Sequence, residues 1–156
     1  KKDNLQELEP EIKGPVTTIS SKNIKISLMS FEDLGDQLLG EESSYSKRSD
    51  VTTTERFIKV VVGAENIGKE ETKAGEWDIG EIVDSEGRKF NKFEKASPWI
   101  PAENNCAKNL KPGFAPTLCT KIYEVARISK DMKLKVIFKS SSSGSGSGNF
   151  IDLVEI

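Results

Sequence analysis

The residues of this chain that could do chemistry are two cysteines, several acidic side chains and many serines and lysines, because histidine is absent. Without histidine the chain lacks the commonest general base and the commonest ligand of transition metals. A Ser-His-Asp or Cys-His arrangement is therefore impossible within it. A Ser-Lys hydrolase is the remaining catalytic alternative, but no serine occupies a Gly-x-Ser-x-Gly turn. We expect a protein that is not an enzyme, and the sequence indicates no catalytic residue.

Metal and cofactor sites have equally little support in the sequence. A structural zinc site needs four Cys or His ligands, and two cysteines do not supply them. Four carboxylates could offer oxygens to calcium: Asp78, Glu81, Asp84 and Glu86. However, Asp-Ser-Glu-Gly at residues 84–87 is ordinary turn chemistry and lacks the twelve-residue loop of a calcium-binding hand. We expect no metal and no cofactor, and weak calcium binding is left open.

The two cysteines, Cys106 and Cys119, lie thirteen residues apart with a Pro112-Gly113 turn between them. They allow one intramolecular disulfide, and the alternative is two free buried thiols. In the chain-entropy model, a disulfide that closes a loop of this length stabilises a protein by about 3 kcal/mol. Such a bond would place the protein in an oxidising compartment. We expect Cys106 and Cys119 to be bonded.

Length and charge limit the classes of protein to consider. The chain has 156 residues, 23 basic and 25 acidic, with a net charge of −2, so one domain without a basic face for nucleic acid is expected. No apolar run reaches the roughly 18 residues of a membrane span. Residues 1–15 predict a flexible tether, and residues 16–156 a single domain. Because the first residue is Lys1, a leader or lipid anchor upstream is a possibility.

Short apolar stretches separated by turn residues dominate the domain. The clearest is residues 57–66, in which Ile58, Val60 and Val62 share one face and Lys59 lies on the other. Further strands are expected over residues 16–19, 24–29, 76–84, 88–93, 117–125, 132–138 and 150–156. No long helix is indicated. The pattern predicts an all-β, antiparallel β-sandwich of seven to nine strands, with a small closed β-barrel as the alternative.

Three polar segments separate these strands. Residues 41–55 are rich in Ser, Thr and charge, and predict a long exposed loop. Residues 95–108 form a second loop, in which Trp99 stands between Pro98 and Pro101. Trp99 either caps the core or is an exposed aromatic anchor, so Trp99, Pro98 and Pro101 are the candidate partner-binding residues. Residues 140–148 are a Ser/Gly run, either a natural hairpin tip or an engineered insert.

Four segments in order resemble the bacterial and archaeal telokin-like family of unknown function. They are V-V-V-G-A-E-N-I-G, I-V-D-S-E-G-R-K-F, L-K-P-G followed by C-T-K-I-Y-E-V-A, and K-L-K-V-I-F. Ala126 departs from the family's usual proline, and the loops at residues 41–54 and 140–148 are long. The resemblance, over residues 24–156, implies an immunoglobulin-like β-sandwich and export as a secreted, surface or lipid-anchored protein. The family has no agreed activity, so the resemblance transfers no site residue.

Two functions compete on this basis. The first is a non-catalytic extracytoplasmic binding or adhesion module, whose partner would be a protein or a cell-envelope component. The loops at the end of a sandwich would hold its binding residues. The second is a structural spacer or subunit of a surface assembly, in which a sheet edge or the last strand pairs with a neighbour.

The expected disulfide makes a direct prediction. Thiol titration of the denatured, non-reduced protein should find essentially no free thiol, because both sulfurs would be in one bond. Two titratable thiols per chain would contradict the pairing and weaken the assignment to an oxidising compartment with it.

Overall fold

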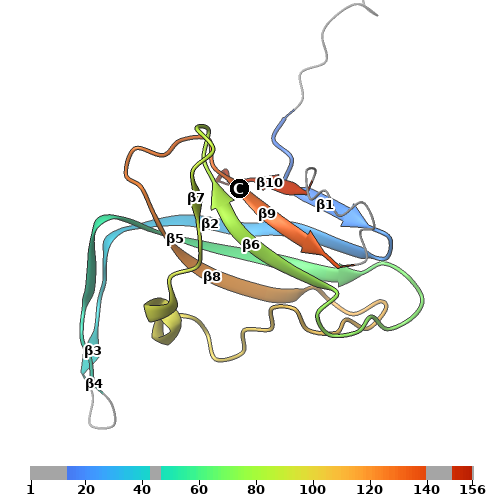
Figure 1. Ribbon diagram of the computed structural model, residues 1–156. Helices are drawn as coiled ribbons and strands as arrows, with labels where there is room; N and C mark the ends of the chain where they lie inside the picture. The colour runs from blue at the N-terminus through green and yellow to red at the C-terminus, as the bar shows by residue number, and fades with distance from the viewer. Residues whose placement is uncertain (1–13, 43–46, 140–148, 156) are drawn as a thin grey trace, which may run out of the picture.

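Eight strands form two stacked antiparallel sheets in the computed structural model, which describes residues 14–42, 47–139 and 149–155 (Figure 1). The first sheet has the order β1 (Thr18–Ser21), β2 (Ile24–Leu38), β5 (Val51–Asn66), β8 (Thr117–Val125). The second has the order β10 (Phe150–Asp152), β9 (Lys133–Phe138), β6 (Trp77–Val83), β7 (Lys89–Phe90). The predicted all-β antiparallel sandwich is confirmed, and the eight strands of its two sheets lie within the expected seven to nine.

The two sheets meet at both of their edges without joining into a barrel. At one edge, the amide of Asp152, the last residue of β10, donates to the Val16 carbonyl just before β1, at 2.8 Å. At the other, the Phe93 amide donates to the Ile122 carbonyl of β8, also at 2.8 Å. The strand ladders nevertheless stay in separate sheets among the described residues, so the barrel alternative is not formed. Contacts of this kind cover sheet edges that would otherwise be open to another chain.

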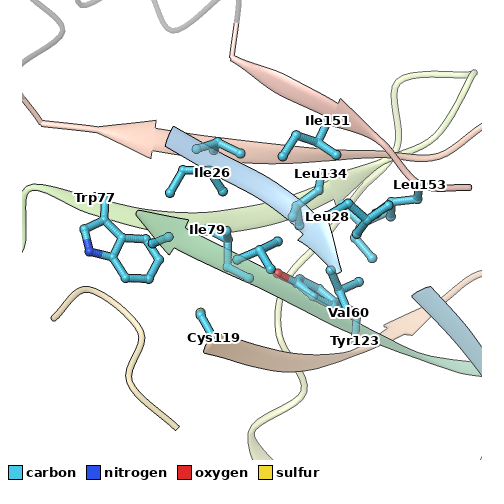
Figure 2. Close-up of a cluster of buried hydrophobic side chains, with 14 of the residues drawn as sticks. Ile26, Leu28, Val60, Trp77, Ile79, Cys119, Tyr123, Leu134, Ile151 and Leu153 are labelled. Atoms are coloured by element: carbon cyan, nitrogen blue, oxygen red, sulfur yellow. The ribbon is translucent and has the colours of Figure 1, made fainter. Parts of the chain in front are cut away.

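The main core fills the space between the sheets, and Figure 2 shows side chains from both entering it. Ile58, Val60 and Val62 of β5 are fully buried, which confirms the predicted apolar face of this strand. Trp77 is fully buried as well, and its indole N–H donates to the Lys108 carbonyl at 2.7 Å. Trp77 therefore lies in the core, and its one polar atom has a partner.

The prediction of a long loop at residues 41–55 is wrong. Strands β2 and β5 run on past the sandwich and pair as far as Leu38 and Val51. The short strands β3 (Glu41–Glu42) and β4 (Lys47–Arg48) then extend the pair into a projecting hairpin arm, residues 34–42 and 47–56 (Figure 1). The local sequence is polar because much of the arm lies in solvent, and pairing across the hairpin makes it a strand.

Asn66, in the first motif of the resemblance, joins three segments at one end of the sandwich. Its amide donates to the carbonyls of Glu70 and Leu110, and its side-chain oxygen accepts from the Gly68 amide. Gly68 lies so close to Asn23 that an added Cβ would stand 2.5 Å from the Asn23 Cγ. The Asn-x-Gly motif is thus explained by a buried amide and a close approach of two turns.

Asp84, in the second motif, holds the β6–β7 turn together. Its carboxylate accepts hydrogen bonds from the amides of Glu86 and Arg88, the Arg88 guanidinium and the Ser129 hydroxyl. Burial alone would raise the pKa of Asp84, but the hydrogen bonds from Ser129 and Arg88 outweigh it and hold the pKa well below its usual range. Gly87 completes the predicted turn, with a φ of 86°. These hydrogen bonds give the Asp84 carboxylate a structural role in the turn, which differs from the calcium ligand considered above.

Two predicted segments lie mainly outside the described residues. The N-terminal tether, residues 1–15, is described only from Gly14, and the Ser/Gly run at residues 140–148 is not described. Contacts with the domain include Val16, whose amide donates to the Asp152 carboxylate at 2.9 Å. Val16, the residue at which the sequence predicts the domain to begin, is therefore in contact with the domain.

A pair of substitutions tests the assignment of faces on β5. Val60→Asp would place a carboxylate in the main core at a fully buried position, so it should destabilise the domain by several kcal/mol, or about its whole stability. Lys59→Asp, on the opposite face, should cost less than about 1 kcal/mol. Chemical denaturation of the two variants measures both effects. Equal losses of unfolding free energy would show that the face assignment is wrong.

Candidate functional site

The outer edge of β8 is covered by an edge loop, residues 92–108. The Phe93 amide donates to the Ile122 carbonyl at the start of the loop, and the Asn105 amide donates to the Leu118 carbonyl near its end. Between these two attachments the chain leaves the strand and carries the short 3-10 helix η1 (Glu94–Trp99). In Figure 1 this segment runs along the side of β8. The edge loop therefore closes the sheet edge and leaves a hollow beneath its middle.

Asn104 attaches the loop to β8 with its side chain in place of a peptide group. Its side-chain oxygen accepts from the Thr120 amide at 2.6 Å, and its side-chain amide donates to the Thr120 carbonyl at 3.0 Å. This pair of bonds is what a neighbouring strand would make with Thr120. The backbone of the edge loop can thus diverge from β8 while the strand keeps both of its hydrogen bonds.

The disulfide between Cys106 and Cys119 fastens the same end of the edge loop covalently. Cys119 is fully buried in β8, whereas Cys106 is partly exposed in the loop. The Cys106 sulfur lies 3.7 Å from the Asn104 side-chain oxygen. The bond expected from the sequence is therefore present, and it lies beside the Asn104 attachment.

An edge cleft of about 560 Å³ opens between the edge loop, β8 and the start of β6. Its lining is mostly polar and comes from segments far apart in the sequence. The residues are Asp78, Lys92, Phe93, Glu94, Ser97, Ile100, Pro101, Ala102, Asn104, Cys106, Thr120, Lys121 and Ile122. The cleft shares its concave shape and convergent polar groups with typical small-molecule sites, but it lacks their mostly apolar lining.

An ion pair lies in the wall of the cleft. The Lys121 ammonium is 3.3 Å from the Asp78 carboxylate and donates to the Ile79 carbonyl at 2.8 Å. The Lys121 side chain is only 14% exposed, because the strand places it on the inward face of the sheet. This pair ties β8 of the first sheet to β6 of the second, and it gives the cleft two fixed charges of opposite sign.

A second hydrophobic cluster supports the loop from the other face of the first sheet. Phe57 and Ile122 are buried there beneath Ala96 of η1, and Leu38 joins them from the hairpin arm. The centroids of the Phe57 and Phe93 rings are 5.1 Å apart. Both strands contain two adjacent apolar residues at this point, and this break in the alternation is the signal that could have revealed burial on both faces.

Trp99 lies against this second cluster. The ring is half-buried, and its indole N–H donates to the Leu39 carbonyl at the base of the arm, at 2.7 Å. The burial and the hydrogen bond of Trp99 are closer to those of a residue that caps the core than to those of an exposed aromatic anchor. Pro98 and Pro101 are exposed, and Pro101 lines the cleft. Of the three candidate partner-binding residues, the prolines therefore offer most of the surface, while Trp99 braces the arm.

The cleft contains serine and lysine, which the Ser-Lys alternative would need. Lys121 pairs with Asp78, and Lys92 lies 3.8 Å from Glu94. In the described part of the chain, no hydrogen bond joins Ser97 to either lysine. The geometry therefore gives no support to a Ser-Lys hydrolase, and the absence of enzyme activity stays a prediction.

Comparison with known proteins bears on the fold. No protein-family model and no curated protein matches the chain. Among solved structures, the fold is similar to that of a conserved hypothetical protein from Bacillus anthracis. The TM-score is 0.57 at 13% sequence identity, over 88% of this chain and 92% of that one. The described residues contain no helix long and apolar enough to span a membrane.

The Asn104 attachment can be tested by substitution. Asn104→Ala should lower the free energy of unfolding by about 2 kcal/mol, because it leaves both polar groups of Thr120 without their partner. Asn105→Ala is the matched control, since its side-chain oxygen accepts only an exposed bond from Lys108 and its backbone bond is kept. It should change stability by less than about 0.5 kcal/mol. Equal losses in the two variants would contradict the assigned role of Asn104.

Proposed function

We propose that this chain is a non-catalytic extracytoplasmic binding or adhesion module, and that it recognises its partner through the edge cleft and the edge loop. The observation that carries the proposal is the construction of the loop. It is held on β8 at both ends by backbone bonds, at one end by Asn104, and there also by the disulfide. A loop fixed in this way loses little entropy when a partner binds.

The hairpin arm adds to this surface because it is braced against the sandwich on two sides. On one side, Trp99 of the edge loop donates to the Leu39 carbonyl. On the other, Arg127 donates from its backbone amide to the Glu55 carboxylate, and its guanidinium lies 3.7 Å from Asp36. The edge loop and the hairpin arm are therefore both held against the sandwich, and a partner could contact both without reordering them.

The chemistry of the cleft indicates a polar partner. Lys92 and Glu94 place charges of both signs at its rim, and Asn104 and Thr120 are committed to each other in its wall. Such a mixed surface suits a protein or a polar cell-envelope component, and it lacks the basic stripe that nucleic acid requires.

Three observations support the family and the compartment as parts of the same proposal. The telokin-like motifs fall on residues with defined structural roles, such as Asn66 and Asp84. The architecture is a β-sandwich. The Cys106–Cys119 disulfide suits an oxidising location, secreted or at the outer face of the cell membrane.

The alternative function, a spacer or subunit of a surface assembly, finds one favourable feature in the arm. It projects from the sandwich and exposes Leu39 by 64%. In contrast, the Asp152 amide of the last strand and the edge of β8 already have partners within the chain. Assembly would therefore use the arm in place of a sheet edge. Sedimentation that depends on protein concentration would favour this alternative.

A capture experiment with two matched variants tests the binding proposal. The immobilised full chain is exposed to solubilised envelope or surface fractions, beside Ala102→Arg and Ala115→Arg. Ala102 lines the edge cleft and Ala115 lies in an exposed loop elsewhere, and both are exposed. An arginine at position 102 should obstruct the cleft and reduce binding by about tenfold or more, equivalent to about 1.4 kcal/mol.

The control variant, Ala115→Arg, should capture the same component as the original chain. If Ala102→Arg binds as well as the original chain, or if both variants lose binding equally, the cleft is not the recognition surface. If neither the original chain nor either variant captures any component of these fractions, the result would count against a binding module of this kind.

A further inference from the structure

Three groups that can ligate a metal ion converge in the wall of the edge cleft. They are the Asp78 carboxylate and the sulfurs of Cys106 and Cys119, whose ligand atoms all lie within 4.8 Å of one another. They come from β6, the edge loop and β8, so the fold alone brings them together. Asp78 and Cys106 both line the cleft, which gives an ion and its water a path from solvent.

We propose that reduction of the Cys106–Cys119 disulfide by a dithiol creates a zinc-binding site made of Cys106, Cys119 and Asp78. The S–S bond breaks as each sulfur takes up an electron and a proton, and the dithiol is oxidised to its cyclic disulfide. Zn²⁺ then binds the two sulfurs as thiolates and releases the two protons to water. The Asp78 carboxylate supplies the third ligand and water from the cleft the fourth, as in sites with an open position.

The positions of the sulfurs fit this change with a small movement. Two thiolates on one tetrahedral zinc ion, each at about 2.3 Å, stand about 3.8 Å apart. The Cα atoms of Cys106 and Cys119 are now 4.6 Å apart. Cys119 is held in strand β8 and is fully buried, whereas Cys106 lies in the partly exposed loop. The sulfur of Cys106 can therefore move outward while Asp78 and Cys119 stay in place.

Charge balance favours the same ion. Two thiolates and a carboxylate carry three negative charges, and Zn²⁺ leaves one of them uncompensated. The Lys121 ammonium, 3.3 Å from Asp78 and mostly buried, supplies the remaining positive charge. It also keeps its bond to the Ile79 carbonyl when Asp78 turns to the metal. Zinc would thus hold the end of the edge loop to β8 after the covalent bond has been broken.

The test uses the full chain, reduced with a dithiol that is then removed without air, because free dithiol itself binds zinc. Co²⁺ serves as the spectroscopic probe and Zn²⁺ as its competitor. The reduced chain should bind one Co²⁺, with thiolate-to-cobalt charge-transfer absorption and the visible bands of a tetrahedral site, and Zn²⁺ should displace it. The oxidised chain should show neither signal.

Two substitutions separate the proposed site from a simple pair of thiols. Asp78→Asn should weaken Zn²⁺ binding to the reduced chain by more than about tenfold, since even the loss of groups that only support a ligand has that effect. Glu94→Gln, which removes a carboxylate from the same cleft outside the three converging groups, should leave the affinity unchanged. Equal affinity of Asp78→Asn and the original chain would overturn the proposal, because the two sulfurs alone would then explain binding.

The folded state of the reduced chain is followed in the same samples by near-ultraviolet circular dichroism. The proposal expects a native spectrum with zinc, because the fold must bring Asp78 to the cysteines. A reduced chain that stays unfolded in the presence of Zn²⁺, or a folded one that binds no Co²⁺, would also overturn it.

Discussion

The unpaired edge of β8 is the constraint on which the rest of the site depends. A strand at the side of a sheet presents amide and carbonyl groups that must find partners or remain open to another chain. Here the backbone of the edge loop supplies partners at two points, and the Asn104 side chain supplies two more. Because the loop must return to the strand at both points, its middle is pushed outward. The edge cleft and η1 are consequences of that return.

The second hydrophobic cluster follows from the same geometry. Once η1 crosses onto the outer face of the first sheet, Phe57 and Ile122 are buried on that face by Ala96. This cluster also holds Leu38, so the base of the hairpin arm is packed against the body. The sandwich therefore has a third, local layer at one corner. That layer joins the loop, the sheet and the arm into one unit, on which the proposed recognition surface lies.

Two of the motifs behind the family resemblance contain a hydrogen-bond centre for a turn. Asn66 joins the end of β5 to the segment before β8, and Asp84 joins the β6–β7 turn to Ser129. Each is a buried polar group with partners, the arrangement that a sandwich needs wherever its chain reverses. These two residues therefore specify how the chain folds at its turns. Of the charged and reactive groups of the cleft, Cys119 and Lys121 lie in the third motif, whereas Asp78 and Cys106 lie outside the four motifs.

The sequence by itself determined most of the strands and the buried face of β5, because alternating apolar residues and turn residues act over a few positions. It also determined which cysteines could pair, since there are only two. Only the tertiary structure decided that residues 51–55 are strand, that Asn104 replaces a peptide group, and that Asp78 meets the disulfide. Each of these depends on contacts between segments distant in the sequence, and local pattern contains no record of such contacts.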